Sequence, residues 1–287
     1  MGSKFLPLLL ALIPMFGWGA NAVLIAKLSR LVGGLKSGLF IQASALAISL
    51  LFLPIFFSPP RAIDWLLVLF AGGSGALTYY LYCRCLKEGS VPIVVPIVSA
   101  WALVSFVLGI IFLKESLTTL KIVGTGLTIL GIIFLSINWR GIKSLKTIIS
   151  AGVLTALVVA LGMGVNSFIM GLISRQTGWF FGSFLMRVSM VLFLLSLYLF
   201  KQPNINKKLV SPISWKLLLP AAILEFVAFT AYNLAVSKYE ISYVSVISSA
   251  SPLITVIFAR FFLYEKTSLI QKVGTFFTVC GIISLNI

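Results

Sequence analysis

The chain has 287 residues, of which 60% are hydrophobic and only 10% are charged, and its formal net charge is +16. Water-soluble domains carry roughly 25% charged residues, so this composition excludes an ordinary soluble fold and indicates a membrane protein. The chain has no histidine and no Cys-x-x-Cys pair, which argues against zinc, haem and disulfide-scaffold proteins. For the same reason we expect no metal and no cofactor. The basic residues stand singly between apolar runs and form no basic face, so we expect no nucleic-acid partner.

Apolar runs of about 20 residues, long enough to cross roughly 30 Å of hydrocarbon, follow one another along the whole sequence. Backbone groups in hydrocarbon must pair internally, so runs of this length favour helices. The first run lacks a signal-peptide cleavage site, and we expect it to be retained as a spanning helix. We therefore predict an all-α polytopic membrane protein with ten transmembrane helices. They cover residues 5–27, 36–57, 64–86, 91–113, 118–138, 147–173, 178–200, 214–237, 241–263 and 268–287.

An internal repeat relates the two halves of the sequence. A shift of 150 residues pairs identical residues that include Ser99 with Ser249, Glu115 with Glu265, Gly124 with Gly274, Thr128 with Thr278, and Gly131 with Gly281. A shift of 145 places residues 17–21 over 162–166 and Gln42 over Arg187. We predict one five-helix repeat in residues 1–140 and a second in 145–287. Because five is odd, the second repeat enters the membrane upside down, which is the inverted-repeat plan of many secondary transporters.

Each repeat ends with a glutamate followed by two glycines seven residues apart. Seven residues is about two helical turns, so both glycines face the same neighbour and allow close helix packing. A carboxylate near a helix start is stabilised by the helix dipole. We therefore expect structural rather than transport roles for Glu115 and Glu265.

Together these features resemble the EamA type of the drug/metabolite transporter superfamily, which has ten transmembrane helices. The residues that carry the resemblance are Trp18-Gly19-Ala20-Asn21, Arg187, Ser251-Pro252, and the two patterns Glu115…Gly124…Gly131 and Glu265…Gly274…Gly281. The resemblance implies a central cavity lined by helices 1, 3, 4, 6, 8 and 9, and transport of small metabolites by alternating access. The chain departs from the pattern with Gln42 where such families often have Arg, and with Ala102 where the second half has Pro252.

Two charges lie deep inside predicted spans. Glu225 is about ten residues into the run 214–237, where a charge costs at least roughly 2.5 kcal/mol, and intramembrane acids are functional candidates by default. It could bind a coupling proton or a substrate amine, or it could make a structural hydrogen bond or ion pair. Arg187 could pair with Glu225 or with backbone carbonyls, or it could bind a substrate carboxylate or phosphate in a bidentate manner.

Polar and aromatic side chains near the span centres are the candidate cavity lining. Ser245, Ser248 and Ser249 belong to a serine-rich stretch that either bonds to a neighbouring helix or faces a wet cavity. The deeper amides need hydrogen-bond partners, in a binding site or in a packing contact. The candidates are Trp18, Asn21, Tyr79, Tyr82, Ser99, Trp101, Asn166, Tyr232, Asn233, Tyr243, Ser245, Ser248 and Ser249.

These features predict a secondary transporter, permease or exporter, that moves a small polar metabolite such as an amino acid. We expect a small-molecule substrate, surrounding membrane lipids, a proton as candidate coupling ion, a monomer or homodimer, and a place in the plasma membrane. A lipid-modifying enzyme is one alternative, but clustered acids or a phosphate-binding loop are not visible in the sequence. A non-transporting scaffold is the other. The resemblance implies cytoplasmic termini, whereas the distribution of Lys and Arg favours the opposite orientation.

Overall fold

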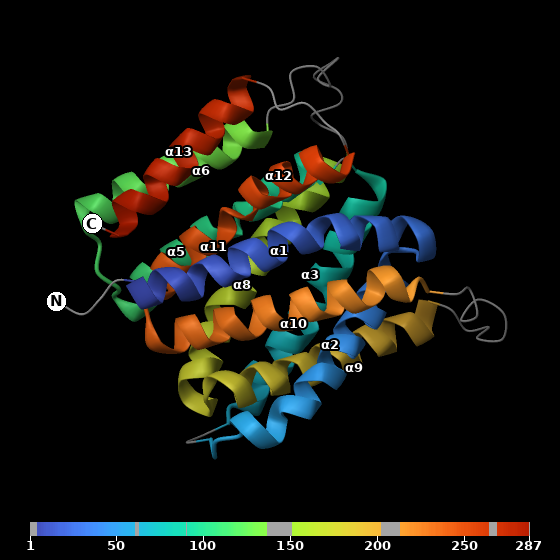
Figure 1. Cartoon of the computed structure of the whole chain (residues 1–287). Helices are drawn as coiled ribbons and strands as arrows, with labels where there is room; N and C mark the ends of the chain where they lie inside the picture. The colour runs from blue at the N-terminus through green and yellow to red at the C-terminus, as the bar shows by residue number, and fades with distance from the viewer. Residues whose placement is uncertain are drawn as a thin grey trace.

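The structure is a computed structural model, and it describes residues 5–60, 63–89, 91–136, 151–201, 213–263 and 269–286. These residues form long helices packed side by side (Figure 1), and none of them forms a strand. In the first half the helices are α1 (Phe5–Val32), α2 (Gly34–Phe56), α3 (Trp65–Glu88), α4 (Val91–Ser99), α5 (Trp101–Leu113) and α6 (Thr119–Ser136). In the second half they are α8 (Ala151–Thr177), α9 (Trp179–Lys201), α10 (Trp215–Lys238), α11 (Ile241–Ser249), α12 (Ser251–Leu263) and α13 (Leu269–Asn286).

The predicted all-α polytopic membrane fold is confirmed. Eight spans of the described residues are long and apolar enough to cross a membrane, and two of these spans each include a pair of short helices, α4 with α5 and α11 with α12. The other two predicted spans, 118–138 and 268–287, correspond to shorter apolar helices within α6 and α13. Large apolar side chains such as Leu66 and Phe200 lie exposed on the outer helix faces, as expected for surfaces in contact with lipid.

Two of the predicted spans, 91–113 and 241–263, are present, but the helix of each is interrupted in the middle. The breaks fall at Ala100 and Ala250, whose amides bond to carbonyls only three residues back, at 3.2 Å and 3.1 Å. In the second half, Pro252 has no amide proton to continue the helical ladder. The first half breaks at the equivalent position with Ala102 in place of the proline, so proline is not required for the break.

Glycines at equivalent positions make the tight connections between the first two helices of each half. Gly33 joins α1 to α2 with a φ of 92°, and Gly178 joins α8 to α9 with a φ of 87°. Residues with a Cβ rarely adopt this left-handed region. The two glycines are 145 residues apart, so the repeat seen in the sequence extends to backbone conformation.

The two halves also contact each other in symmetric pairs. In α5, Ser105 donates a hydrogen bond to the carbonyl of Gly164 in α8, and in α12, Thr255 donates to the carbonyl of Gly19 in α1, both at 2.9 Å. Each donor and each acceptor is the repeat equivalent of the other. Such reciprocal contacts are those of two inverted repeats related by an approximate two-fold axis.

The glycines that close each repeat bring α6 and α13 together at one edge of the bundle (Figure 1). A Cβ at Gly131 would meet Thr278 and would lie 2.7 Å from the Gly274 carbonyl oxygen. A Cβ at Gly281 would meet Thr128 and the Gly124 carbonyl oxygen in the same way. The predicted packing role of these glycines is therefore confirmed.

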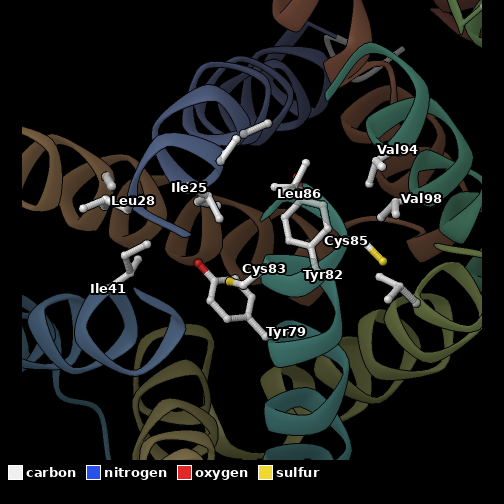
Figure 2. Packing of buried hydrophobic residues seen from close by; sticks show 14 of the residues in the cluster. Ile25, Leu28, Ile41, Tyr79, Tyr82, Cys83, Cys85, Leu86, Val94 and Val98 are labelled. Atoms are coloured by element: carbon white, nitrogen blue, oxygen red, sulfur yellow. The ribbon is translucent and has the colours of Figure 1, made fainter. Parts of the chain in front are cut away.

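Buried apolar side chains form two clusters, and both continue into the wall of a central cavity. One gathers around α1, α3 and α4, where Figure 2 shows Tyr82 standing between Ile25 and Val98. The other surrounds Trp101 and Tyr232. Glu265 lies outside the described residues, as do 137–150, so the structure does not describe that part of the repeat pattern.

Candidate functional site

A cavity of about 120 Å³ lies between the two halves, near the middle of the long helices. Ligand clefts usually measure about 300–1,000 Å³, so in this conformation the cavity encloses little more than a small molecule. Its wall includes seven of the predicted residues: Trp18, Tyr79, Tyr82, Ser99, Trp101, Asn166 and Glu225. Further lining residues include Gln42, Thr78, Ser167, Phe229 and Ser251.

A chain of hydrogen bonds joins the two intramembrane charges. Arg187 in α9 donates from Nη1 to Oε1 of Gln42 at 2.7 Å, and Gln42 in α2 donates from Nε2 to Oε1 of Glu225 at 3.0 Å. Asn21 in α1 donates to the other carboxylate oxygen, also at 3.0 Å. The network thus links four helices, α1, α2, α9 and α10, and the amide of Gln42 separates the two charges.

Arg187 lies behind the cavity wall and does not line the cavity. Its side chain is buried, with 1% of its surface exposed, and the guanidinium carbon lies 4.4 Å from the centre of the Phe229 ring. The attraction between a cation and a ring face stabilises this arrangement. The Nη2 atom has no hydrogen-bond partner among the described residues.

Three aromatic rings pack together at one side of the cavity. Trp18 lies edge to face with Trp101 at 6.0 Å between ring centroids, and Tyr232 lies 5.5 Å from Trp18 and 5.9 Å from Trp101. The hydroxyl of Tyr232 shares a 2.8 Å hydrogen bond with Ser245. This aromatic layer joins α1, α5 and α10, and Ser245 extends it to α11.

The remaining predicted residues do not line the cavity, and several of them form hydrogen bonds between or within helices instead. Ser248 donates to the carbonyl of Ala11 in α1 at 3.2 Å, and Ser249 bonds within its own helix to Val246. Asn233 accepts from Ser174 at 2.6 Å and donates to the Phe229 carbonyl at 2.7 Å. These contacts favour helix packing, one of the two alternatives left open for these residues.

Asn166 and Asn21 occupy equivalent places in the two repeats but differ in their surroundings. Asn166 donates to the carbonyl of Ala71 at 2.7 Å and to Ser74 at 3.2 Å, and it lines the cavity. Asn21 lies just outside the wall and orients Glu225, while its own Oδ1 has no partner among the described residues.

A second pocket, of about 990 Å³, lies at the end of the bundle where the chain begins and ends, and Tyr243 contributes to its wall. Here Glu115 accepts the amide protons of Ile241 and Ser242, at 2.7 Å and 2.9 Å, and so caps the first turn of α11. This capping contact is the kind that a structural role of Glu115 predicts, although the helix that it caps lies in the opposite half of the chain.

At the same end, Lys121 of α6 forms an ion pair with Glu240, which precedes α11. Burial raises the pKa of the Glu240 carboxyl, but hydrogen bonds from Lys121 and Ser116 outweigh this effect and hold the pKa below its ordinary value. The carboxylate therefore stays ionised at neutral pH, and the contact between the halves persists.

Sequence reasoning missed Gln42 as a site residue. The signal was present, because the repeat places Gln42 over Arg187, and residues that are equivalent in two-fold repeats can meet on the axis. Phe229 and Ser251 were missed as lining residues because an aromatic ring or a serine in an apolar helix does not by itself indicate a cavity. Among the described residues, no group of three or more Cys, Asp or Glu residues could hold a metal ion.

Comparison with known proteins identifies the repeat. The profile of the EamA-like transporter family matches the chain twice, over residues 5–137 and 150–287. No curated protein sequence matches. Among 28 matching chains of solved structures, one crystal structure superposes with a TM-score of 0.76 and 14% identity, over 97% of this chain and 95% of the other. At that identity the likeness shows a shared fold alone.

Proposed function

Because the chain belongs to the EamA-like transporter family, we propose that it is a secondary transporter that moves a small polar metabolite, such as an amino acid, by alternating access. The family consists of small-molecule transporters rather than enzymes. The chain is accordingly a multi-pass membrane transporter, embedded in lipid and acting on a small-molecule substrate. We further propose that it works in the plasma membrane, as a monomer or homodimer.

One observation carries the proposal: the cavity between the two halves contains a buried carboxylate. Transporters built from inverted repeats place their substrate sites near the membrane midplane, at the interface of the repeats. Glu225 lies there, although a charge at that depth is expensive. Asn21 and Gln42 fix its orientation, as expected for a preorganised site.

Alternating access requires, on each side of the site, a barrier of contacts that can close and open. On the side of the chain termini, the aromatic layer of Trp18, Trp101 and Tyr232 lies next to the cavity. Farther out, Glu115 and the Lys121–Glu240 pair join the two halves. These contacts between the repeats, proposed as residues 1–140 and 145–287, would form the barrier on that side, and they must separate for the cavity to open there.

Glu225 is also the proposed site of a coupling proton. Among the described residues that line the cavity it is the single carboxylic acid. Protonation would remove its charge and change how it accepts the hydrogen bonds from Asn21 and Gln42. A proton bound there is therefore coupled to the same side chains that would hold a substrate.

The test is transport in proteoliposomes, with and without a pH gradient, after a thermal-shift screen has selected a ligand from amino acids, organic cations, nucleotides and sugar phosphates. We expect Glu225→Gln to abolish the effect of the gradient or the binding of substrate. Glu88→Gln, at an exposed i,i+4 pair with Arg84, is the matched control and should behave as wild type. Unchanged transport and pH dependence in Glu225→Gln would contradict the proposed site.

A further inference from the structure

We propose that the cavity recognises its substrate through a positively charged ammonium group, so that the preferred substrate is a small organic amine. This inference rests on the proposed transport function and narrows it. An amino acid would then be bound through its amino end, and its carboxylate would contribute nothing or weaken binding.

The charge of the cavity wall favours a positively charged substrate. Among the described residues that line the cavity, Glu225 alone carries a charge. Each of its oxygens accepts one hydrogen bond, from Gln42 and from Asn21. A carboxylate offers about four lone-pair positions, so it can accept further donors from an ammonium group.

The position of Arg187 is a second argument, because this cation would be the strongest partner for a substrate carboxylate. The amide of Gln42 accepts from Arg187 at 2.7 Å and stands between the guanidinium and Glu225. The Phe229 ring covers the guanidinium at 4.4 Å, and Phe229 itself lines the cavity. The wall therefore presents a ring and an amide to the cavity, and the positive charge stays behind them.

The aromatic side chains of the wall also favour a positively charged substrate. Trp18, Tyr79, Tyr82, Trp101 and Phe229 all line the cavity. Ring faces attract ammonium groups, and they do so more strongly where water is excluded. A carboxylate gains nothing from such faces. Rings around a single carboxylate thus favour a cation, and the volume of about 120 Å³ favours a small one.

The experiment measures binding of two matched series to the purified full-length protein by concentration-dependent thermal shift. The aliphatic series is isobutylamine, valine, isovalerate and isobutanol, and the aromatic series is phenethylamine, phenylalanine, 3-phenylpropionate and 2-phenylethanol. Each series keeps one side chain and changes only the polar end. Glu225→Gln is measured beside wild type, with Glu88→Gln as the control for loss of a carboxylate elsewhere.

In at least one series, we expect the amine to bind at least about tenfold more tightly than the amino acid, because the strong contact is the charged hydrogen bond to Glu225. The acid and the alcohol should give no saturable thermal shift. Glu225→Gln should no longer bind the amine, whereas Glu88→Gln should still bind it.

An amino acid or acid that binds as tightly as its amine would overturn the cation site and leave the transport proposal standing. Undiminished amine binding in Glu225→Gln would also overturn it. If none of the eight compounds binds wild type, both the cation site and the proposed substrate cavity fail.

Discussion

At the scale of single residues, Gln42 explains how two opposite charges coexist inside the bundle. Gln42 and Arg187 are repeat equivalents, and they meet in a 2.7 Å hydrogen bond near the approximate two-fold axis. An arginine at position 42 would place two guanidinium groups face to face, and like charges at that distance repel. A glutamine instead accepts from Arg187 and donates to Glu225. The departure from the family pattern thus becomes the link between the charges.

Replacing this link should destabilise the protein. We expect Gln42→Leu to lower the free energy of unfolding by about 3 kcal/mol, because Arg187 and Glu225 each lose a buried hydrogen bond to a charged group. Thermal unfolding in detergent measures the change. Gln176→Leu, at an exposed position of α8, is the matched control and should stay close to wild type. Equal stability of the two variants would show that Gln42 does not connect the charges.

The depth of a residue in the membrane was predictable from the sequence, but its partners were not. Counting from the span ends located Glu225 and Arg187 near the centre, and both are buried. The direction of a side chain depends on helix rotation, which an apolar sequence hardly constrains because all faces are hydrophobic. Hence Ser248 and Asn233, which are as polar as the lining residues, bond to neighbouring helices instead.

At the scale of helices, the closing pair α6 and α13 depends on small residues at four equivalent positions. Each of the two later glycines faces a threonine of the opposite helix, Gly131 facing Thr278 and Gly281 facing Thr128. The carbonyls of Gly124 and Gly274 accept hydrogen bonds from those threonines within each helix, at 2.8 Å and 2.9 Å. Helices in lipid associate through such close packing.

A single methyl group should therefore separate the pair. We expect Gly131→Ala to lower the unfolding free energy by about 1–3 kcal/mol, the usual range for overpacking, because the new Cβ meets Thr278 and the Gly274 carbonyl. Gly126→Ala lies in the same helix with nothing within 4 Å and should be neutral, or stabilising by up to about 1 kcal/mol. Thermal unfolding of both variants provides the comparison. A stable Gly131→Ala protein would contradict the close contact.

The helices could be predicted from the sequence because apolar runs of about 20 residues satisfy their backbone groups in hydrocarbon as helices, whereas the strands of a barrel are about half as long. The interruptions were harder to predict. Pro252 indicated a perturbation in one half, but the other half breaks at Ala100 without a proline at the corresponding position. The symmetric contacts of α5 with Gly164 and of α12 with Gly19 accompany these breaks, and such contacts between distant segments are not encoded in local periodicity.

At the scale of the whole molecule, the two repeats enclose one polar cavity, and two layers of contact between the halves lie on the side of the chain termini. The repeat, visible at shifts of 145 and 150 residues, predicts two inverted halves with a site between them. The layers depend on which residues meet across the halves. Glu115 caps α11, and Lys121 pairs with Glu240, more than a hundred residues away in the sequence. Only the assembled bundle shows that these contacts lie on the same side as the aromatic layer.

The central claim is that the cavity opens in turn to the two sides of the membrane. The most direct test places one cysteine in the cavity, as Ser251→Cys, in a protein whose Cys83, Cys85 and Cys280 are replaced by alanine. A membrane-impermeant maleimide is then applied to sealed vesicles, from the outside or from the lumen. The account predicts labelling from both sides, slowed by bound substrate. Labelling from one side only, or labelling that saturating substrate leaves unchanged, would contradict it.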